Sequence, residues 1–224
     1  MILDGGLGTE LQGAGLPAGV AADTWVMQHP RRVRQAHEAF VQAGAQIVCT
    51  ATLCTHTSQE GWAKQLEQAV HLAQGLGAEV YLSLGPGSDH GRMVSHVADQ
   101  IDGVVLETFV DIHQAEQALH NVRKAYEGPC VVSVVPLPQV SVPALRQLGQ
   151  KGATGLGLNC MPASRLLQVV PHLSSFPLWL KPSGDDFEQW MALAPYATWL
   201  GGCCGLGPSG LARRVARLTA EEGP

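Results

Sequence analysis

The chain has 224 residues, of which 46% are hydrophobic, and its formal net charge is −5. That length suits one large domain or two small ones, and the apolar fraction is sufficient for a sizeable core. The acidic balance and the absence of a run of basic residues exclude a nucleic-acid-binding stripe. The sequence lacks both a basic segment followed by a long apolar one at its start and an apolar run of about 18 residues, so we expect no signal peptide and no membrane helix.

Eight short apolar runs alternate with longer amphipathic segments. The runs predict strands at residues 2–3, 46–51, 79–84, 103–106, 130–135, 155–158, 178–180 and 198–200. The amphipathic segments predict helices at residues 31–43, 58–76, 90–100, 112–126, 142–151, 163–173, 186–193 and 209–220. Helix-start signals support two of them, since Asp111 precedes the fourth helix and Pro208 and Ser209 open the last.

Eight strand–helix units in 224 residues predict an α/β protein with a (β/α)8 TIM barrel, in a single compact domain over residues 1–224. A doubly wound open sheet uses the same alternation and is the alternative. The barrel is favoured because the unusual residues follow the strands. In a barrel all carboxyl ends of the strands share one face, whereas an open sheet divides them between two crevices.

The six cysteines are scattered, which suits a reducing cytoplasm better than a disulfide scaffold. Three of them follow predicted strands in glycine-rich segments: Cys160 after Gly-Leu-Asn, and Cys203 with Cys204 between glycines. Three thiolates fill three corners of a tetrahedral zinc site and leave the fourth to a substrate, which is typical of catalytic zinc. The flanking glycines allow adjacent cysteines to leave strand geometry and face one metal. The alternative is three buried structural cysteines, which is the interpretation we prefer for Cys49 and Cys130.

Polar residues also follow other predicted strands. Asp4 and Gly5 open a glycine-rich loop whose spacing matches no phosphate-binding motif, so the acidic residue suits an ammonium group, or merely caps a turn. Glu107 ends an apolar run, where an unpaired carboxylate is costly to bury, and we expect it to face solvent or a cationic ligand. Thr50 and Thr52 belong to a loop of small hydroxyl residues that can bind a carboxylate, or they are β-branched strand filler.

Taken in order, these motifs resemble the homocysteine S-methyltransferase family. That family includes the betaine and S-methylmethionine enzymes and the homocysteine domain of cobalamin-dependent methionine synthase. The resemblance is carried by residues 4–11, 29–45, 85–86, 107–108, 157–160 and 201–205. It extends over essentially the whole chain, and the paired cysteines with the upstream Asn-Cys are its most specific part. The chain is nevertheless markedly shorter than typical members.

The resemblance implies a (β/α)8 barrel in which the same three cysteines hold zinc. It also implies that Asp4 and Glu107 contact the amino group of homocysteine and that the loop at residues 50–53 lies near its carboxylate. The implied reaction is transfer of a methyl group to the thiolate of homocysteine, which gives methionine. We therefore expect a cytoplasmic enzyme with Zn²⁺ as cofactor, homocysteine as partner, and neither nucleic acid nor membrane among its partners.

The methyl donor stays open at this point. S-methylmethionine is a small sulfonium that can enter a barrel mouth, and a methylated corrinoid protein is large and needs an uncovered face. Aromatic residues make up 5% of the chain and Cys54 replaces an aromatic of the family, so a cation–π cage for betaine is poorly supplied. Two alternatives to the enzyme are a non-catalytic zinc- and homocysteine-binding subunit of a corrinoid system, and an unrelated barrel lyase or hydrolase with buried cysteines.

Overall fold

The computed structural model describes residues 1–87, 89–137 and 141–221, and in these residues the fold is α/β with a parallel sheet. The sheet's seven strands are β1 Ile47–Cys49, β2 Glu79–Leu84, β3 Gly103–Phe109, β4 Cys130–Val134, β5 Gly155–Pro162, β6 Leu178–Ser183 and β7 Trp199–Leu200. They are hydrogen-bonded in chain order, without the reversal that a doubly wound sheet requires. The prediction of alternating strands and helices is therefore confirmed, and the sheet is compatible with a TIM barrel.

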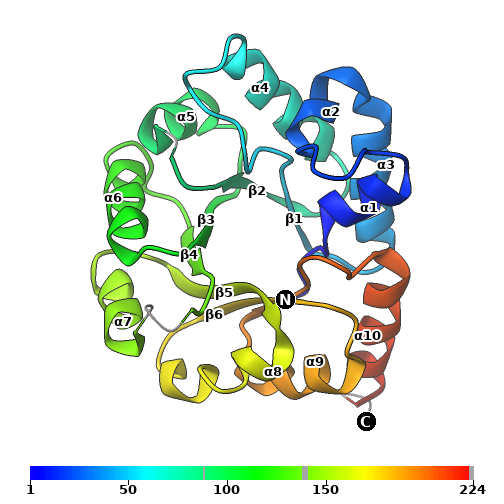
Figure 1. Ribbon diagram of the computed structural model, residues 1–224, viewed down its shortest axis with the longest axis vertical. Coiled ribbons are helices and arrows are strands. Elements are labelled where there is room, and N and C mark those ends of the chain that lie inside the picture. Colours follow the sequence, from blue (N-terminus) through cyan, green and yellow to red (C-terminus); the bar gives the residue numbers. More distant parts are fainter. Residues whose placement is uncertain (88, 138–140, 222–224) are drawn as a thin grey trace.

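The first residues of the chain lie between the two edge strands. Ile2 forms a parallel bridge with Leu200 of β7, and Leu3 forms one with Ile47 of β1. The Leu3 N–H donates to Leu200 O at 2.9 Å, and the Asp4 N–H donates to Ile47 O at 3.0 Å. Figure 1 shows the strands as a ring at the centre, with the helices around it. The amino-terminal segment thus contacts both ends of the sheet.

The helices are α1 Leu7–Gly13, α2 Asp23–Gln28, α3 Pro30–Gln42, α4 Trp62–Ala73, α5 His90–Val97, α6 Ile112–Arg123, α7 Val142–Gln150, α8 Ala163–Leu166, α9 Phe187–Leu193 and α10 Pro208–Glu221, with 3-10 turns at Val170–Leu173 and Ala194–Tyr196. The predicted helix at 163–173 divides into α8 and a 3-10 turn at Pro171, which lacks the N–H that a continuous helix needs. The short helices α1 and α2 were not predicted. None of the helices in the described residues is both long and apolar enough to cross a membrane.

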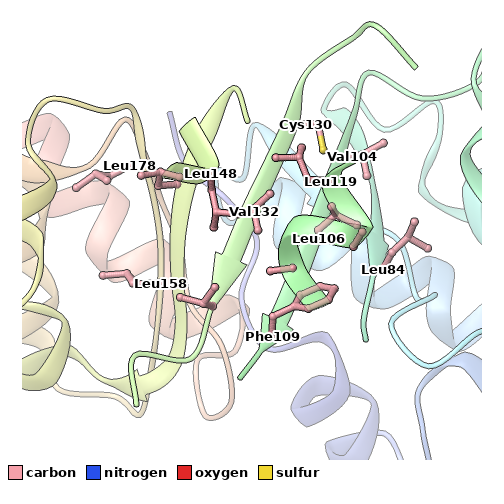
Figure 2. Packing of buried hydrophobic residues seen from close by; sticks show 14 of the residues in the cluster. Leu84, Val104, Leu106, Phe109, Leu119, Cys130, Val132, Leu148, Leu158 and Leu178 are labelled. Atoms are coloured by element: carbon pink, nitrogen blue, oxygen red, sulfur yellow. The ribbon is translucent and has the colours of Figure 1, made fainter. Parts of the chain in front are cut away.

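Alternate residues of the strands face two separate cores. Figure 2 shows Leu106 and Val132 on the outer face of neighbouring strands, beside Leu119 of α6, and all three are buried. The residue before each of these two strand residues faces the other way. Val105 and Val131 point inward and pack with side chains from β1, β2 and β6. Burial on both faces explains why the predicted strands are continuous apolar runs. Cys49 and Cys130 are buried in these two cores, as expected for structural cysteines.

Candidate functional site

The carboxyl ends of the strands and the loops that follow them enclose a cavity of about 260 Å³. Most of the predicted site residues line it: Asp4, Gly5, Thr50, Glu107, Cys160, Cys203 and Cys204. They come from the segment before α1, from the ends of β1, β3 and β5, and from the loop after β7. The topology therefore brings together residues that are up to 200 positions apart, as expected when parallel strands end on one face.

Three cysteine sulfurs meet in this cavity. The Sγ atoms of Cys160 and Cys203 are 3.0 Å apart, and those of Cys203 and Cys204 are 3.9 Å apart. Cys160 has a φ of 59°, in the left-handed region that a side chain rarely adopts, and the register of β5 with β6 shifts after Asn159. Such a bulge re-aims a side chain away from its regular direction. Strained backbone thus turns Cys160 toward the vicinal pair.

The three thiols fit zinc in their chemistry and nearly in their spacing. Ligand sulfurs of a tetrahedral site with bonds of about 2.3 Å are roughly 3.8 Å apart. Cys203 and Cys204 match that separation, whereas the sulfurs of Cys160 and Cys203 are closer by roughly 0.8 Å. In the described residues no group of three or more His, Cys, Asp or Glu side chains has the arrangement of a formed metal site.

Hydrogen bonds inside the cluster distribute its charge. The hydrogen bonds of Cys203 with Cys160 and Cys204 hold the pKa of Cys203 far below its usual range. The same hydrogen bonds raise the pKa of Cys160 and the pKa of Cys204. The Asn159 amide donates to the Cys160 Sγ at 3.3 Å, and Ser133 donates to the Asn159 Oδ1 at 2.9 Å. These hydrogen bonds favour the thiolate form of Cys203 over those of Cys160 and Cys204. Asn159 and Ser133 hold the Cys160 side of the cluster in place.

Asp4 has a partner, Lys181, to which no sequence motif points. The Lys181 Nζ donates to its Oδ1 at 2.6 Å, and the Cys49 N–H donates to its Oδ2 at 2.8 Å. Burial lowers the pKa of Lys181, but the charges of Asp4, Cys49 and Glu107 and the hydrogen bond with Asp4 together outweigh burial, so that pKa is raised well above its usual value. A sequence signal did exist, since Lys181 directly follows the apolar run 178–180 and an unpaired buried cation is costly. That signal did not indicate that Asp4 is the partner of Lys181.

Glu107 also borders the cavity, but unlike Asp4 it is held by a hydrogen bond and not by an ion pair among the described residues. The Ser83 hydroxyl donates to its Oε1 at 2.6 Å. Burial raises the pKa of Glu107, and the charge of Lys181 and the hydrogen bond from Ser83 offset part of that rise. Within the described residues Glu107 forms no ion pair, although Lys181 lies in the same cavity. The expectation that Glu107 faces solvent or a cationic ligand agrees with this position.

The two predicted threonines, Thr50 and Thr52, form hydrogen bonds with each other and with Ser83. Thr52 donates to Ser83 O at 2.6 Å, and Thr50 shares a hydrogen bond of 2.6 Å with Thr52. Thr50 also accepts from the Ser83 N–H at 3.1 Å. Because Thr52 donates its hydroxyl hydrogen to Ser83 O, Thr50 must be the donor in its hydrogen bond with Thr52. Neither hydroxyl hydrogen is left for a ligand, and Thr52 is fully buried outside the cavity wall.

Two glycines allow the backbone segments around the cavity to approach closely. A Cβ on Gly5 would overlap the carbonyl oxygen of Leu206, and a Cβ on Gly201 would overlap that of Asp4. The Gly202 N–H donates to Asp4 O at 3.1 Å across the same contact. The loop after β7, which carries Cys203, is thereby held against the loop that carries Asp4.

Comparison with known proteins gives one family and several solved structures. The sequence model of the homocysteine S-methyltransferases matches residues 1–218. The metallated form of the homocysteine methyltransferase MmuM from Escherichia coli aligns with a TM-score of 0.83 at 20% identity, over 97% of this chain and 96% of that chain. Its apo form gives 0.79 at 22% identity, over 97% and 95%.

A more distant structural match is a putative dihydrodipicolinate synthetase from Pseudomonas aeruginosa. Its TM-score is 0.61 at 13% identity, over 84% of this chain and 70% of that chain. Similarities at these identities show the shared fold alone. Among curated proteins there is no match.

Proposed function

This chain belongs to the homocysteine S-methyltransferase family and is a methyltransferase, and from that premise we propose that it methylates homocysteine with zinc held by Cys160, Cys203 and Cys204. The observation that carries the proposal is the meeting of three thiols at one cavity with Glu107 and the Asp4–Lys181 pair. The cavity offers a place for a thiol and an anion for an ammonium group. Both groups belong to homocysteine.

The cysteines prepare the site for its acceptor thiol. When bound, zinc would supply a positive centre that deprotonates a coordinated thiol, whose ordinary pKa is about 8.5. The strained backbone at Cys160 and the Asn159 amide fix one side of the donor set, and the loop clamped at Gly201 fixes the other. Orienting groups of this kind typically lie within hydrogen-bond reach of the ligands that they hold.

The remaining cavity residues orient the acceptor. In this proposal Asp4 and Glu107 receive the ammonium group, and the backbone of the loop at residues 50–53 and of Gly5 surrounds the carboxylate end. The thiol then loses its proton to solvent, its sulfur forms a bond to the methyl carbon, and the donor leaves with the electron pair of the bond that breaks. Because the reaction needs little else, holding the reacting atoms in line supplies much of the rate.

The closed form of the fold is part of the proposal. A single domain over residues 1–224 with a (β/α)8 barrel requires an eighth strand between β7 and β1. The bridges of Ile2 to Leu200 and of Leu3 to Ile47 support that role for the amino-terminal segment. Closure explains why Asp4 stands at the same face as the ends of the other strands.

The donor that we propose is S-methylmethionine or a methylated corrinoid protein. Among the described residues that line the cavity none is aromatic, which argues against an aromatic cage for betaine. We propose a cytoplasmic setting, which suits six cysteines that include no disulfide among the described residues.

The test is methionine formation from homocysteine with a panel of donors, in zinc-loaded and metal-free protein. We expect turnover with one donor only in the zinc-loaded protein. Cys204→Ser should lose both the metal and the activity, whereas Cys54→Ser, which removes a cavity cysteine outside the cluster, should keep both. Full activity in the metal-free protein would contradict the proposal. Zinc and homocysteine binding without turnover on any donor would indicate a binding subunit instead.

A further inference from the structure

One carboxylate of the cavity wall takes no part in the site described so far. Asp23, the first residue of α2, lines the cavity and is 5% exposed. Figure 1 shows α2 on the side of the ring where β1 lies, whereas β5, which carries Cys160, lies across the ring. The cavity residues beside Asp23 in sequence or in contact with it are Ala21, Ala22 and Cys54, which bring no positive charge.

One oxygen of Asp23 has a structural role. The Cys54 N–H and the Thr55 hydroxyl both donate to its Oδ2, each at 2.8 Å, and thereby fasten the loop after β1 to α2. Within the part of the chain that the structure describes, no other residue donates to Oδ1, and Asp23 forms no ion pair. Burial raises the pKa of Asp23, and the two hydrogen bonds and the charge of His56 oppose that rise. A cation in the cavity would favour the carboxylate further.

The chemistry of methyl transfer limits which cation suits this carboxylate. As the homocysteine thiolate forms its bond to the methyl carbon of a sulfonium, the old sulfur–methyl bond breaks. Its electron pair stays on the donor sulfur, which becomes a neutral thioether. An anion beside that sulfur would stabilise the substrate more than the transition state and slow the transfer. An ammonium group keeps its charge throughout, so an anion beside it binds the donor without that cost.

We propose that Asp23 binds the ammonium group of the methyl donor, and that the donor is a small sulfonium with a separate ammonium group, such as S-methylmethionine. The inference rests on the proposed function and chooses between its two donors. Asp23 then acts through both oxygens: Oδ2 fastens the loop after β1, and Oδ1 receives the donor.

Initial rates of homocysteine consumption by the zinc-loaded full chain test the proposal with two donors. One is S-methyl-L-methionine, and the other is 4-(dimethylsulfonio)butanoate, which has the same sulfonium and carboxylate but no amino group. The ratio of their kcat/KM values measures recognition of the ammonium alone. Asp23→Asn removes the charge and keeps an oxygen acceptor. The matched control Thr55→Val removes one hydrogen bond to Oδ2 and keeps the charge.

We expect a ratio of about 10 or more in the wild type and in Thr55→Val, the scale of a hydrogen bond between charged groups. In Asp23→Asn the ratio should fall to about 1, while the Kd of homocysteine changes by less than about twofold, as for a separate subsite. A merely structural Asp23 would lower the rates with both donors together and leave the ratio as it is, which would overturn the proposal.

The wild type alone gives a second test, which does not depend on the folding of a variant. A wild-type ratio near 1, or turnover with methylcobalamin and with neither sulfonium, would overturn the inference and leave the proposed function standing. A wild type that methylates homocysteine with none of these donors would refute the proposed function itself, which is a separate outcome.

Discussion

At the scale of single residues, the site depends on how buried charges are paired. Lys181 and Asp4 form an ion pair in the interior, and hydrogen bonds with Cys160 and Cys204 hold the pKa of Cys203 below its usual range. Glu107, in contrast, has no ion-pair partner among the residues that the structure describes. Its pKa is raised mainly by burial, so its charge depends on pH over a higher range than that of an ordinary glutamate.

The raised pKa of Glu107 predicts a pH dependence of homocysteine binding. Protonation of Glu107 removes the anion, so the Kd of homocysteine should increase as the pH falls through the raised pKa. Because the folded pKa lies above the unfolded one, the same group lowers the free energy of unfolding as the pH rises through it. Titration calorimetry from mildly acidic to neutral pH measures the first effect.

Glu107→Gln is the control for this prediction. It should bind homocysteine weakly at every pH and show a flatter profile than the wild type. 4-Mercaptobutyrate has the same thiol and carboxylate as homocysteine but no amino group, so any pH effect of the cysteines acts on it too and can be subtracted. An equal pH dependence in the wild type and the variant would show that Glu107 does not carry the effect.

At the scale of elements, most strands and helices could be predicted because the strands are buried on one or both faces and the helices are amphipathic. The helix α6 begins where Asp111 predicted it, with the Asp111 Oδ1 accepting from the His113 N–H at 2.8 Å. The helix α1 was missed because its first residues belong to the glycine-rich loop, whose composition predicts a turn. The pairing of Lys181 with Asp4 was missed because 177 positions separate them and only the strand order joins them.

The cap of α6 predicts a purely structural effect. Asp111→Ala removes the hydrogen bond to an otherwise unpaired N–H, and we expect the free energy of unfolding to fall by about 1 kcal/mol. Urea denaturation measures this change. Asp111→Asn keeps an acceptor at the same position and should lose much less. A change in homocysteine affinity of the alanine variant would contradict the assignment of Asp111 to the fold alone.

At the scale of the whole molecule, the amino-terminal segment forms bridges with both edge strands of the sheet, beside the cavity. Leu3 is fully buried among residues from β1, β2, β3, β4 and β6, and its neighbour Asp4 reaches the cavity. The cluster of cysteines could be predicted from the sequence, since glycines and strand ends marked it. Its contracted spacing could not, because that depends on the backbone of Cys160 and on the bulge in β5.

Leu3→Ala tests this closure. We expect a loss of about 2–5 kcal/mol in the free energy of unfolding, as for other buried leucines. We also expect faster amide exchange in both β1 and β7, since the segment bridges the two. Val20→Ala, at a residue that is 39% exposed, should change the stability by less than about 0.5 kcal/mol. Faster exchange at one edge alone would show that the segment does not join them.

In the proposed site, three cysteines would leave one position at a zinc ion for the thiol of homocysteine. X-ray absorption at the zinc edge measures it most directly, because it counts the sulfur atoms bound to the metal. We predict three sulfur neighbours at about 2.3 Å in the zinc-loaded protein and a fourth after addition of homocysteine. A sulfur count that stays the same when homocysteine binds would contradict the account.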